Sequence, residues 1–194
     1  MKGLIEEALA EGLKPIDILN KGMIEAMGIV GEKFKDGEIF VPEMLVAARA
    51  MKAGVEILKP HMLGEEDISI GKCIIGTVQG DLHDIGKNLV AIMVESSGFK
   101  VIDLGVDVSA EKIIETIKEN PDCSIVGLSA LLTTTMPSLR KTVAAITDAG
   151  LKSQVKIMIG GAPITQDFAD NIGADGYAPD AASAASLAKE MIAA

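Results

Sequence analysis

The sequence predicts an N-terminal helical bundle followed by a doubly wound parallel α/β domain. In the first third of the chain, apolar residues recur at steps of three and four, as they do on one face of a helix. After Gly71 the pattern changes to short apolar runs of strand length that alternate with helix-like segments. This alternation is typical of a parallel sheet covered by helices on both faces.

The predicted bundle spans residues 1–65. Its first long helix begins near Pro15 and carries an apolar stripe made of Ile16, Leu19, Met23, Met27 (or Ala26), Val30 and Phe34. The stretch KDGEIF ends this pattern, and Pro42 opens a second helix with the stripe Leu45, Ala48, Met51, Val55 and Leu58. A short helix from Leu4 to Ala10 completes the bundle. The polar stretch LGEEDISIG, residues 63–71, is the predicted domain boundary.

The second predicted domain spans residues 71–194. Its expected strands lie in KCIIGTV, KVIDLGV, CSIVGLSA, VKIMIGG and the short piece GYA. The expected helices cover residues 87–96, 110–119, 137–149, 167–172 and the final segment 181–194. In a sheet of this kind, ligands bind beyond the carboxyl ends of the strands, where the strand order reverses.

The composition excludes several classes of protein. An apolar fraction of 48% with 24% charged residues indicates a folded chain, and a net charge of -10 without a basic cluster argues against a nucleic-acid partner. No apolar run approaches the roughly 20 residues of a membrane span, and the N-terminus lacks the pattern of a signal peptide. Cys73 and Cys123 are predicted to be buried free thiols. We therefore expect a soluble, cytoplasmic protein without a membrane partner.

Three predicted loops share the carboxyl edge of the sheet. The first, Gly80–Gly86, places His83 between Asp81 and Asp84. The second, from Ser129 to Thr135, is rich in hydroxyl groups, and the third is the glycine pair at 160 and 161. Their convergence at one edge indicates a ligand site.

The chemistry of the first loop leaves several interpretations to weigh. GDLHDIGK lacks both the G-x-G-x-x-G and the Walker spacing, and its aspartates would repel a phosphate. Acidic phosphoacceptor sites of receiver-type domains have no use for a His between the acids. Zinc needs three protein ligands, which are not evident, and His61 beside Pro60 is expected to be a solvated residue at a helix end.

A single imidazole suits a metal that arrives in a macrocycle, because the macrocycle fills the other coordination positions. Asp81 would accept the proton of the second imidazole nitrogen and so fix the tautomer of His83. A surface histidine with two acidic neighbours is the alternative for this motif taken alone.

The motifs D-x-H-x-x-G (Asp81, His83, Gly86), S-x-L (Ser129, Leu131) and G-G (Gly160, Gly161) together resemble the cobalamin-binding domain. The helical first part resembles the cap domain of methionine synthase and of corrinoid methyl-carrier proteins. The resemblance covers essentially the whole chain and implies a Rossmann-like, flavodoxin-like sheet behind a helical cap.

The resemblance implies that His83 coordinates cobalt from below and that Asp81 is its hydrogen-bond partner. Where methionine synthase completes a proton relay with Ser, this chain has Thr135, which keeps the hydroxyl and adds a methyl group. Gly86 is expected to permit the sharp turn into the following helix. The other loop residues near the cofactor are expected to be Gly80, Leu82, Asp84 and Ile85, with Asp84 acting as an acid at the helix start.

The resemblance also implies a slot for the displaced nucleotide tail of the cofactor. Ser129 would bond the base of the tail, Leu131 would form a wall, and Thr133 would bond corrin side chains. Gly160 and Gly161 would let the backbone approach closely, and Ala181 would be a late contact. In the cap, Phe34 and Val41 would cover the upper face, although without the resemblance they are ordinary core residues at helix ends.

The function that the resemblance implies is that of a non-catalytic methyl carrier in a corrinoid-dependent methyltransferase system. Its cofactor would be cobalamin, cycling between Co(I) cobalamin and methylcobalamin. A substrate-specific methyltransferase would supply the methyl group from a methylamine, methanol, betaine or an aryl methyl ether. A corrinoid:acceptor methyltransferase would pass it to a thiol or a tetrahydropterin, and a reductive activator is expected.

The alternative is a cobalamin-binding sensor or storage module without turnover. Light-sensing relatives usually place an aromatic residue, often Trp, over the cofactor, and this chain has no Trp. A stand-alone subunit of an adenosylcobalamin mutase shares the lower motif but is not expected to carry the cap.

Overall fold

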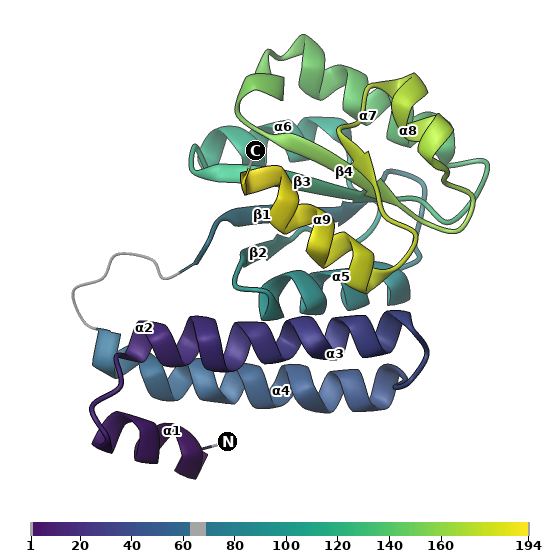
Figure 1. Cartoon of the computed structure of the whole chain (residues 1–194). Helices are drawn as coiled ribbons and strands as arrows, with labels where there is room; N and C mark the ends of the chain where they lie inside the picture. The colour runs from purple at the N-terminus through teal and green to yellow at the C-terminus, as the bar shows by residue number, and fades with distance from the viewer. Residues whose placement is uncertain (1, 63–68, 194) are drawn as a thin grey trace. The chain divides into compact units, whose positions relative to one another are not determined.

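The computed structural model of the chain describes residues 2–62 and 69–193. The chain divides into two compact units, one of Met1–Ser69 with Ser96–Gly98 and one of Ile70–Glu95 with Phe99–Ala194. The first is helical and the second is an α/β sandwich, which confirms the predicted fold class (Figure 1). Most of the predicted boundary, residues 63–68, lies outside the described residues, as does the predicted end of the bundle at residue 65.

The helical unit contains a longer helix pair and a short N-terminal helix. Helix α1 spans Lys2–Ala10. A continuous helical segment then runs through α2 (Pro15–Asp17), the π-helical η1 (Ile18–Ile24) and α3 (Glu25–Lys35). Helix α4 (Val41–Leu58) lies beside α3 and continues into the 3-10 turn η2 (Lys59–Met62). Pro15 and Pro42 both occupy first turns, as predicted, because proline lacks the N–H that a first turn leaves unpaired.

The buried face of α4 differs from the predicted stripe. Met44, Ala48, Met51, Gly54 and Leu58 are buried. Leu45 and Val55, which were predicted for the stripe, are only half-buried. The prediction was wrong at these two positions because periodicity does not separate neighbouring apolar residues and gives no weight to a glycine. A Cβ at Gly54 would lie 2.6 Å from Cε of Met23, so the missing side chain lets η1 pack closely on α4.

The α/β unit has five parallel strands in the order β2-β1-β3-β4-β5. The strands are β1 (Lys72–Thr77), β2 (Lys100–Asp103), β3 (Cys123–Ser129), β4 (Lys156–Gly160) and β5 (Gly176–Tyr177). The helices are α5 (Ile85–Ser96), α6 (Ala110–Glu119), α7 (Met136–Asp148), α8 (Gln166–Ile172) and α9 (Ala181–Ala193), with the 3-10 turn η3 (Leu151–Ser153) before β4. Every strand and helix predicted for this unit is therefore found.

Apolar side chains cover both faces of the sheet. On one face, Ile113 of α6, Leu139 of α7 and Ala169 of α8 share a core with Ile74 and Ile157 of the strands. On the other face, Met158 of β4 packs with side chains of α5 and α9. Cys73 and Cys123 are buried free thiols, as predicted. Within the described part of the chain, no helix has both the length and the apolar character needed to cross a bilayer.

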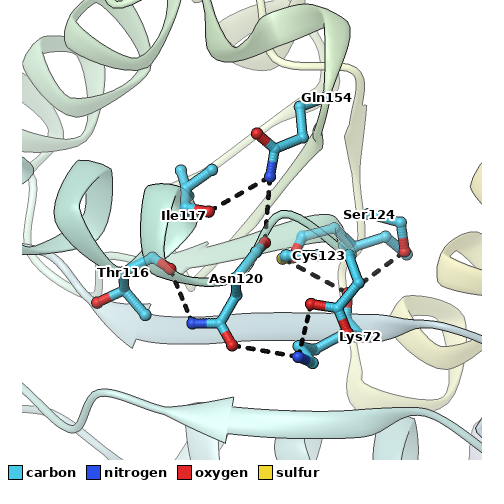
Figure 2. A network of polar contacts seen from close by, with 9 residues as sticks. Lys72, Thr116, Ile117, Asn120, Cys123, Ser124 and Gln154 are labelled. Carbon is cyan, nitrogen blue, oxygen red and sulfur yellow. Dashed lines mark hydrogen bonds and ion pairs between the residues drawn. The ribbon is translucent and has the colours of Figure 1, made fainter. Parts of the chain in front are cut away.

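Polar contacts tie together the amino edge of the sheet (Figure 2). The Lys72 ammonium donates to Oδ1 of Asp122 at 2.7 Å and to Oδ1 of Asn120 at 3.2 Å. The Asn120 side-chain amide donates to the Thr116 carbonyl at 2.9 Å, and the Asn120 backbone carbonyl accepts from Nε2 of Gln154 at 3.2 Å. These contacts fix the turn between α6 and β3. The loops that carry His83 and Thr135 lie at the opposite, carboxyl edge.

The strand order creates a switch point between β1 and β3. From β1 the chain passes to β2 on one side, and from β2 it crosses back to β3 on the other side of β1. The connections that leave β1 and β3 therefore diverge, and in sheets of this kind ligands bind at the carboxyl ends of such strands. The loops that carry His83 and Thr135 follow these two strands.

Candidate functional site

The loop after β1 is shaped at Gly80 and presents His83. Gly80 has a φ of 87°, a left-handed conformation that glycine adopts without a steric penalty. Asp81 follows with a fully buried side chain, whereas the side chain of His83 is 49% exposed. Oγ1 of Thr77, at the end of β1, donates to the His83 carbonyl at 2.9 Å and holds the far side of the loop.

The carboxylate of Asp81 joins the loops that follow β1 and β3. Its Oδ1 lies 2.7 Å from Nδ1 of His83 and accepts the His83 backbone N–H at 3.1 Å. Its Oδ2 accepts from Oγ1 of Thr135 at 2.7 Å and from the Leu131 N–H at 2.8 Å, and lies 3.4 Å from the Leu132 nitrogen. Both carboxylate oxygens are thus occupied by donors.

These donors decide the charge of Asp81 and the tautomer of His83. Burial by itself raises the pKa of the Asp81 carboxyl, but the hydrogen bonds from Thr135, Leu131 and His83 outweigh it and hold that pKa well below its usual range. An ionised carboxylate only accepts hydrogen bonds, so Nδ1 of His83 carries the proton of the 2.7 Å contact. In a neutral imidazole with this proton placement Nε2 has the lone pair, which is the form that binds a metal.

The hydroxyl of Thr135 touches two acceptors. Besides Asp81 it lies 2.9 Å from the Leu132 carbonyl, and its single proton serves one of them at a time. The methyl group that distinguishes Thr from Ser has room, because Cγ2 is 3.7 Å from the place where Gly80 would carry a Cβ. The contact to Asp81 that a relay requires is therefore present.

Polar contacts also anchor the first turn of α5 behind His83. Asp84 accepts through its carbonyl from the Asn88 N–H at 2.7 Å and through Oδ2 from the Asn88 side chain at 3.1 Å, so it acts as the acid at the helix start. The buried Lys87 ammonium pairs with Oδ2 of Asp103, at the end of β2, at 2.5 Å. Lys87 was not predicted from the sequence. Its signal is the spacing to Val90 and Val94, which puts a charge on the apolar face of α5.

Exposed apolar side chains lie on the loop that carries His83 and on the loop that carries Thr135. Leu82 is 73% exposed and Ile85 is 79% exposed, while Leu131 and Leu132 on the neighbouring loop are exposed to a lesser degree. Thr133, on the same loop, is exposed as well. Folding leaves this apolar surface in water, and such a surface is typical of a binding site.

These residues fit the corrin cofactor that the resemblance implies. Among residues 2–62 and 69–193, no three His, Cys, Asp or Glu side chains are placed to hold a metal ion together. The exposed apolar side chains of the two loops suit a large macrocycle, and the low pKa of Asp81 keeps the imidazole in its metal-binding tautomer.

The glycines of the motifs have different structural reasons. Gly86 lies inside α5 without a positive φ, so the left-handed turn belongs to Gly80 and the expectation of a sharp turn at Gly86 was wrong. Gly86 is exposed, and a Cβ there would meet no atom within 4 Å. Gly161 has a φ of 127°, and a Cβ would lie 1.9 Å from the Ala130 carbonyl oxygen. At Gly160 a Cβ would lie 3.0 Å from the Ala178 carbonyl oxygen. The glycine pair is thus required by backbone packing.

The remaining predicted residues are distributed over both units. Ser129 ends β3, is half-buried, and pairs in register with Thr77 and Gly160. Ala181 is buried at the start of α9. In the helical unit, Phe34 is half-buried near the end of α3, and Val41 is 36% exposed at the start of α4. Their predicted contacts with a cofactor stay predictions. His61 is exposed in η2, as expected.

Comparison with known proteins adds two family matches. Residues 71–186 match a model described as the B12 binding domain, and residues 1–59 match a second model with the same description. Trimethylamine corrinoid protein 1 of Methanosarcina acetivorans is 44% identical over 189 residues, which are 96% of this chain and 87% of the relative. Dimethylamine corrinoid protein 1 of the same organism is 46% identical over 190 residues, 97% of this chain and 88% of the relative.

Two solved structures share the fold over nearly the whole chain. A cobalamin-binding protein from Desulfitobacterium hafniense DCB-2 has a TM-score of 0.83 at 35% identity, covering 98% of this chain and 90% of that chain. The methanol:cobalamin methyltransferase complex MtaBC from Methanosarcina barkeri has a TM-score of 0.84 at 31% identity, covering 99% of this chain and 72% of that chain.

Proposed function

This chain belongs to the B12-binding family of corrinoid proteins, and from that premise we propose that it carries a methyl group between two methyltransferases. One methyltransferase takes the group from a small donor, and the other delivers it to a thiol or a tetrahydropterin. The observation that carries the proposal is the exposed His83, whose Nδ1 is bound by the buried Asp81 and whose Nε2 is free to coordinate.

Bound cobalamin supplies the cobalt on which the methyl group travels. The chain contributes the axial ligand and its control. His83 offers Nε2, and Asp81 holds the ring orientation and keeps the proton on Nδ1. Thr135 donates to the other oxygen of Asp81; if that carboxylate gains a proton, the hydroxyl can accept from it while donating its own proton to the Leu132 carbonyl. We assign the relay to Asp81 and Thr135 on this geometry.

The other site residues are assigned by position. Gly80, Leu82, Asp84, Ile85 and Gly86 form the surface next to His83. Leu131 and Thr133 are exposed residues of the neighbouring loop. Ser129, Gly160, Gly161 and Ala181 border the predicted slot for the nucleotide tail, and Phe34 and Val41 supply the apolar cover from the helical unit. We propose these roles together with a location in the cytoplasm.

A methylated amine is the proposed donor. Relatives that are 43–46% identical over nearly the full chain are named trimethylamine and dimethylamine corrinoid proteins. Methanol is the second candidate, because MtaBC is a methanol:cobalamin methyltransferase complex that shares the fold. The complex also supports a donor-specific methyltransferase as partner. The acceptor methyltransferase and a reductive activator are further proposed partners.

Spectroscopy of the reconstituted protein tests the ligand. With cob(II)alamin, electron paramagnetic resonance should show hyperfine coupling to one nitrogen of the protein, together with a base-off absorption spectrum. Uniform ¹⁵N labelling of the protein should change the splitting, because the coupled nitrogen belongs to the chain. The coupling should disappear in His83→Ala and persist in His61→Ala, since the chain has only these two histidines. A ¹⁵N-sensitive signal in His83→Ala would overturn the assignment.

Methyl transfer separates a carrier from a storage module. The reduced, cobalamin-loaded protein is mixed with a trimethylamine-, dimethylamine- or methanol-specific methyltransferase and its substrate, and methylation is followed by absorption. We expect rapid methylation with one amine-specific enzyme. Methylation with the methanol enzyme alone would reassign the donor. Tight cobalamin binding without methylation by any of the three enzymes would favour storage or sensing.

A further inference from the structure

Asp107 is an unexplained residue at the edge of the site. Among the described residues it is the one residue other than glycine with a positive φ, 54°. It lies in the connection between β2 and α6, which also ends at the carboxyl edge of the sheet. Asp tolerates the left-handed region better than most residues, but the region is still uncommon outside glycine. Residues held in sparsely populated backbone conformations cluster at functional sites, so the φ of Asp107 indicates a functional role for this residue.

The contacts of Asp107 converge on the loop that carries His83. Its Oδ1 accepts the Gly80 N–H at 2.7 Å, and its own N–H donates to the Asp81 carbonyl at 3.0 Å. Asp107 thus forms hydrogen bonds with backbone groups of two consecutive loop residues. It contacts Gly80 through its side chain and Asp81 through its main chain. The left-handed φ lets the carboxylate and the N–H of Asp107 face the same segment of the loop.

Neighbouring backbone hydrogen bonds show that these contacts of Asp107 extend the pairing of the β2–α6 connection with β1. The Leu104 N–H donates to Ile75 at 2.8 Å, and the Val108 N–H donates to Thr77 at 3.0 Å. The β2–α6 connection therefore continues to pair with β1 after β2 has ended. Asp107 makes the outermost of these contacts, at the point where β1 has ended and the loop begins.

We propose that Asp107 is a positioning residue for the Asp81–His83 dyad, and this proposal rests on the proposed cobalamin-binding function. By fixing Gly80 and the Asp81 backbone, Asp107 sets where the buried carboxylate stands beneath Nδ1 of His83. The residue acts through Asp81 and touches neither His83 nor the expected ligand position. Asp107 was not predicted, because the predicted site comprised only the loops after the first, third and fourth strands. Its signal is an acid two residues after Gly105 at the same edge.

Three variants and one control separate positioning from plain stability. Asp107→Gly allows the positive φ but removes the acceptor for Gly80. Asp107→Ala removes the acceptor and adds backbone strain. Asp107→Asn keeps both an acceptor oxygen and tolerance of the left-handed region. Ser109→Ala is the matched control, because Ser109 caps α6 from the same connection by accepting the Lys112 N–H at 3.2 Å and does not contact the loop.

The direct readout is the imidazole tautomer of the cofactor-free protein. Long-range ¹H–¹⁵N correlation at about pH 8.5, above the usual titration range of imidazole, reports which nitrogen carries the proton. With two histidines in the chain, His61 serves as the internal reference. We expect His83 to be protonated on Nδ1 in the wild type, Asp107→Asn and Ser109→Ala. Asp107→Gly and Asp107→Ala should show a mixture with the Nε2-protonated form.

The second readout is cobalamin affinity. Loss of residues that orient a metal ligand typically weakens binding about 10–100-fold, and we expect Asp107→Gly near the lower end, about 10-fold. Ser109→Ala should bind like the wild type. A His83 tautomer and an affinity unchanged in Asp107→Gly would overturn the proposal. So would a tautomer that shifts equally in Asp107→Gly and Ser109→Ala, because that pattern reports general loosening.

A measurement on the wild-type protein tests the proposal even if the variants do not fold. The Gly80 amide should exchange slowly with deuterium, because it donates to Asp107. Fast exchange at Gly80 would overturn the proposal without any substitution. The outcomes also separate the two proposals. If wild-type His83 binds cobalt and Asp107→Gly is unchanged, only the positioning role fails, whereas a wild type that does not use His83 removes the proposed function itself.

Discussion

Oγ1 of Thr135 lies 2.7 Å from Oδ2 of Asp81, although the two residues are 54 positions apart in the chain. The contact joins the loops after β1 and β3 at the switch point of the sheet. The methyl group of Thr135 lies over Gly80, where a Cβ would stand 3.7 Å away. Threonine at this position therefore keeps its hydroxyl in contact with the carboxylate, because the glycine opposite leaves room for the methyl carbon.

Thr135→Val should destabilise the protein by about 2 kcal/mol, because the buried carboxylate loses a donor and water does not replace it. Oδ2 of Asp81 would keep only backbone donors from Leu131 and Leu132. Thr135→Ser retains the hydroxyl and should cost less than about 1 kcal/mol for the lost methyl group. The free energy of unfolding in urea measures both. A loss in Thr135→Ser as large as that in Thr135→Val would mean that the methyl group contributes as much as the hydroxyl, which would contradict this account.

The buried ion pair of Lys87 should respond asymmetrically to substitution. Asp103→Asn leaves the Lys87 ammonium, whose side chain is only 2% exposed, without a countercharge. We expect a loss of about 2 kcal/mol, less than for a fully enclosed pair because the Asp103 side chain is 38% exposed. Lys87→Met removes the buried charge altogether and should cost about 1 kcal/mol or less. Guanidinium unfolding of both variants provides the comparison, and a larger loss in Lys87→Met would contradict this account.

The fold followed from the sequence because its periodicities are strong. Buried parallel strands such as CIIGT are continuous apolar runs, and the covering helices repeat at helical steps. Periodicity sets a face only to within one residue, so Met44 and Leu45 were not distinguished. A glycine such as Gly54 contributes nothing to an apolar pattern even where it is buried.

The site was predictable where its residues lie on a loop that directly follows a predicted strand. Asp81, His83 and Thr135 meet because parallel strands bring their carboxyl ends together. Asp107 and Lys87 were not predicted because their roles depend on distant partners, which no local spacing reveals. The partners of Asp107 are in the loop after β1, and the partner of Lys87 is Asp103 at the end of β2. The turn assigned to Gly86 occurs at Gly80, since a glycine in a sequence does not state its φ.

The thiol of Cys73 should make stability fall at alkaline pH. Burial, with a smaller contribution from Cys123, raises the pKa of this thiol far above its usual value. The unfolded thiol ionises above about pH 8.5, whereas the folded thiol stays protonated. The folded state then holds more protons, so the stabilisation is complete below the unfolded pKa and is lost as the pH rises.

Comparison with Cys73→Ala isolates this effect, because other titrating groups are common to both proteins. The stability advantage of the wild type should shrink by about 1 kcal/mol between pH 8 and pH 9.5. Urea unfolding at each pH under reducing conditions gives the difference. A constant difference across this range would show that the folded thiol ionises as readily as the unfolded one.

Gly161→Ala and Gly86→Ala should have opposite effects on the cofactor-free protein. At Gly161 the new Cβ would lie 1.9 Å from a backbone oxygen at a φ of 127°, so we expect a loss of about 3 kcal/mol or more. At Gly86 a Cβ meets no atom within 4 Å and the residue is helical, so alanine should stabilise by about 0.5 kcal/mol.

Cobalamin binding should reverse the favourable effect at Gly86. The open space lies one turn from His83, on the surface proposed to face the corrin, and an inserted methyl group typically costs about 1–3 kcal/mol where it overpacks. Affinity measured by titration should therefore fall about tenfold or more in Gly86→Ala. Ser109→Ala, a substitution in the connection before α6, provides the binding control. If Gly86→Ala is more stable and also binds cobalamin as tightly as the wild type, the corrin does not approach the first turn of α5.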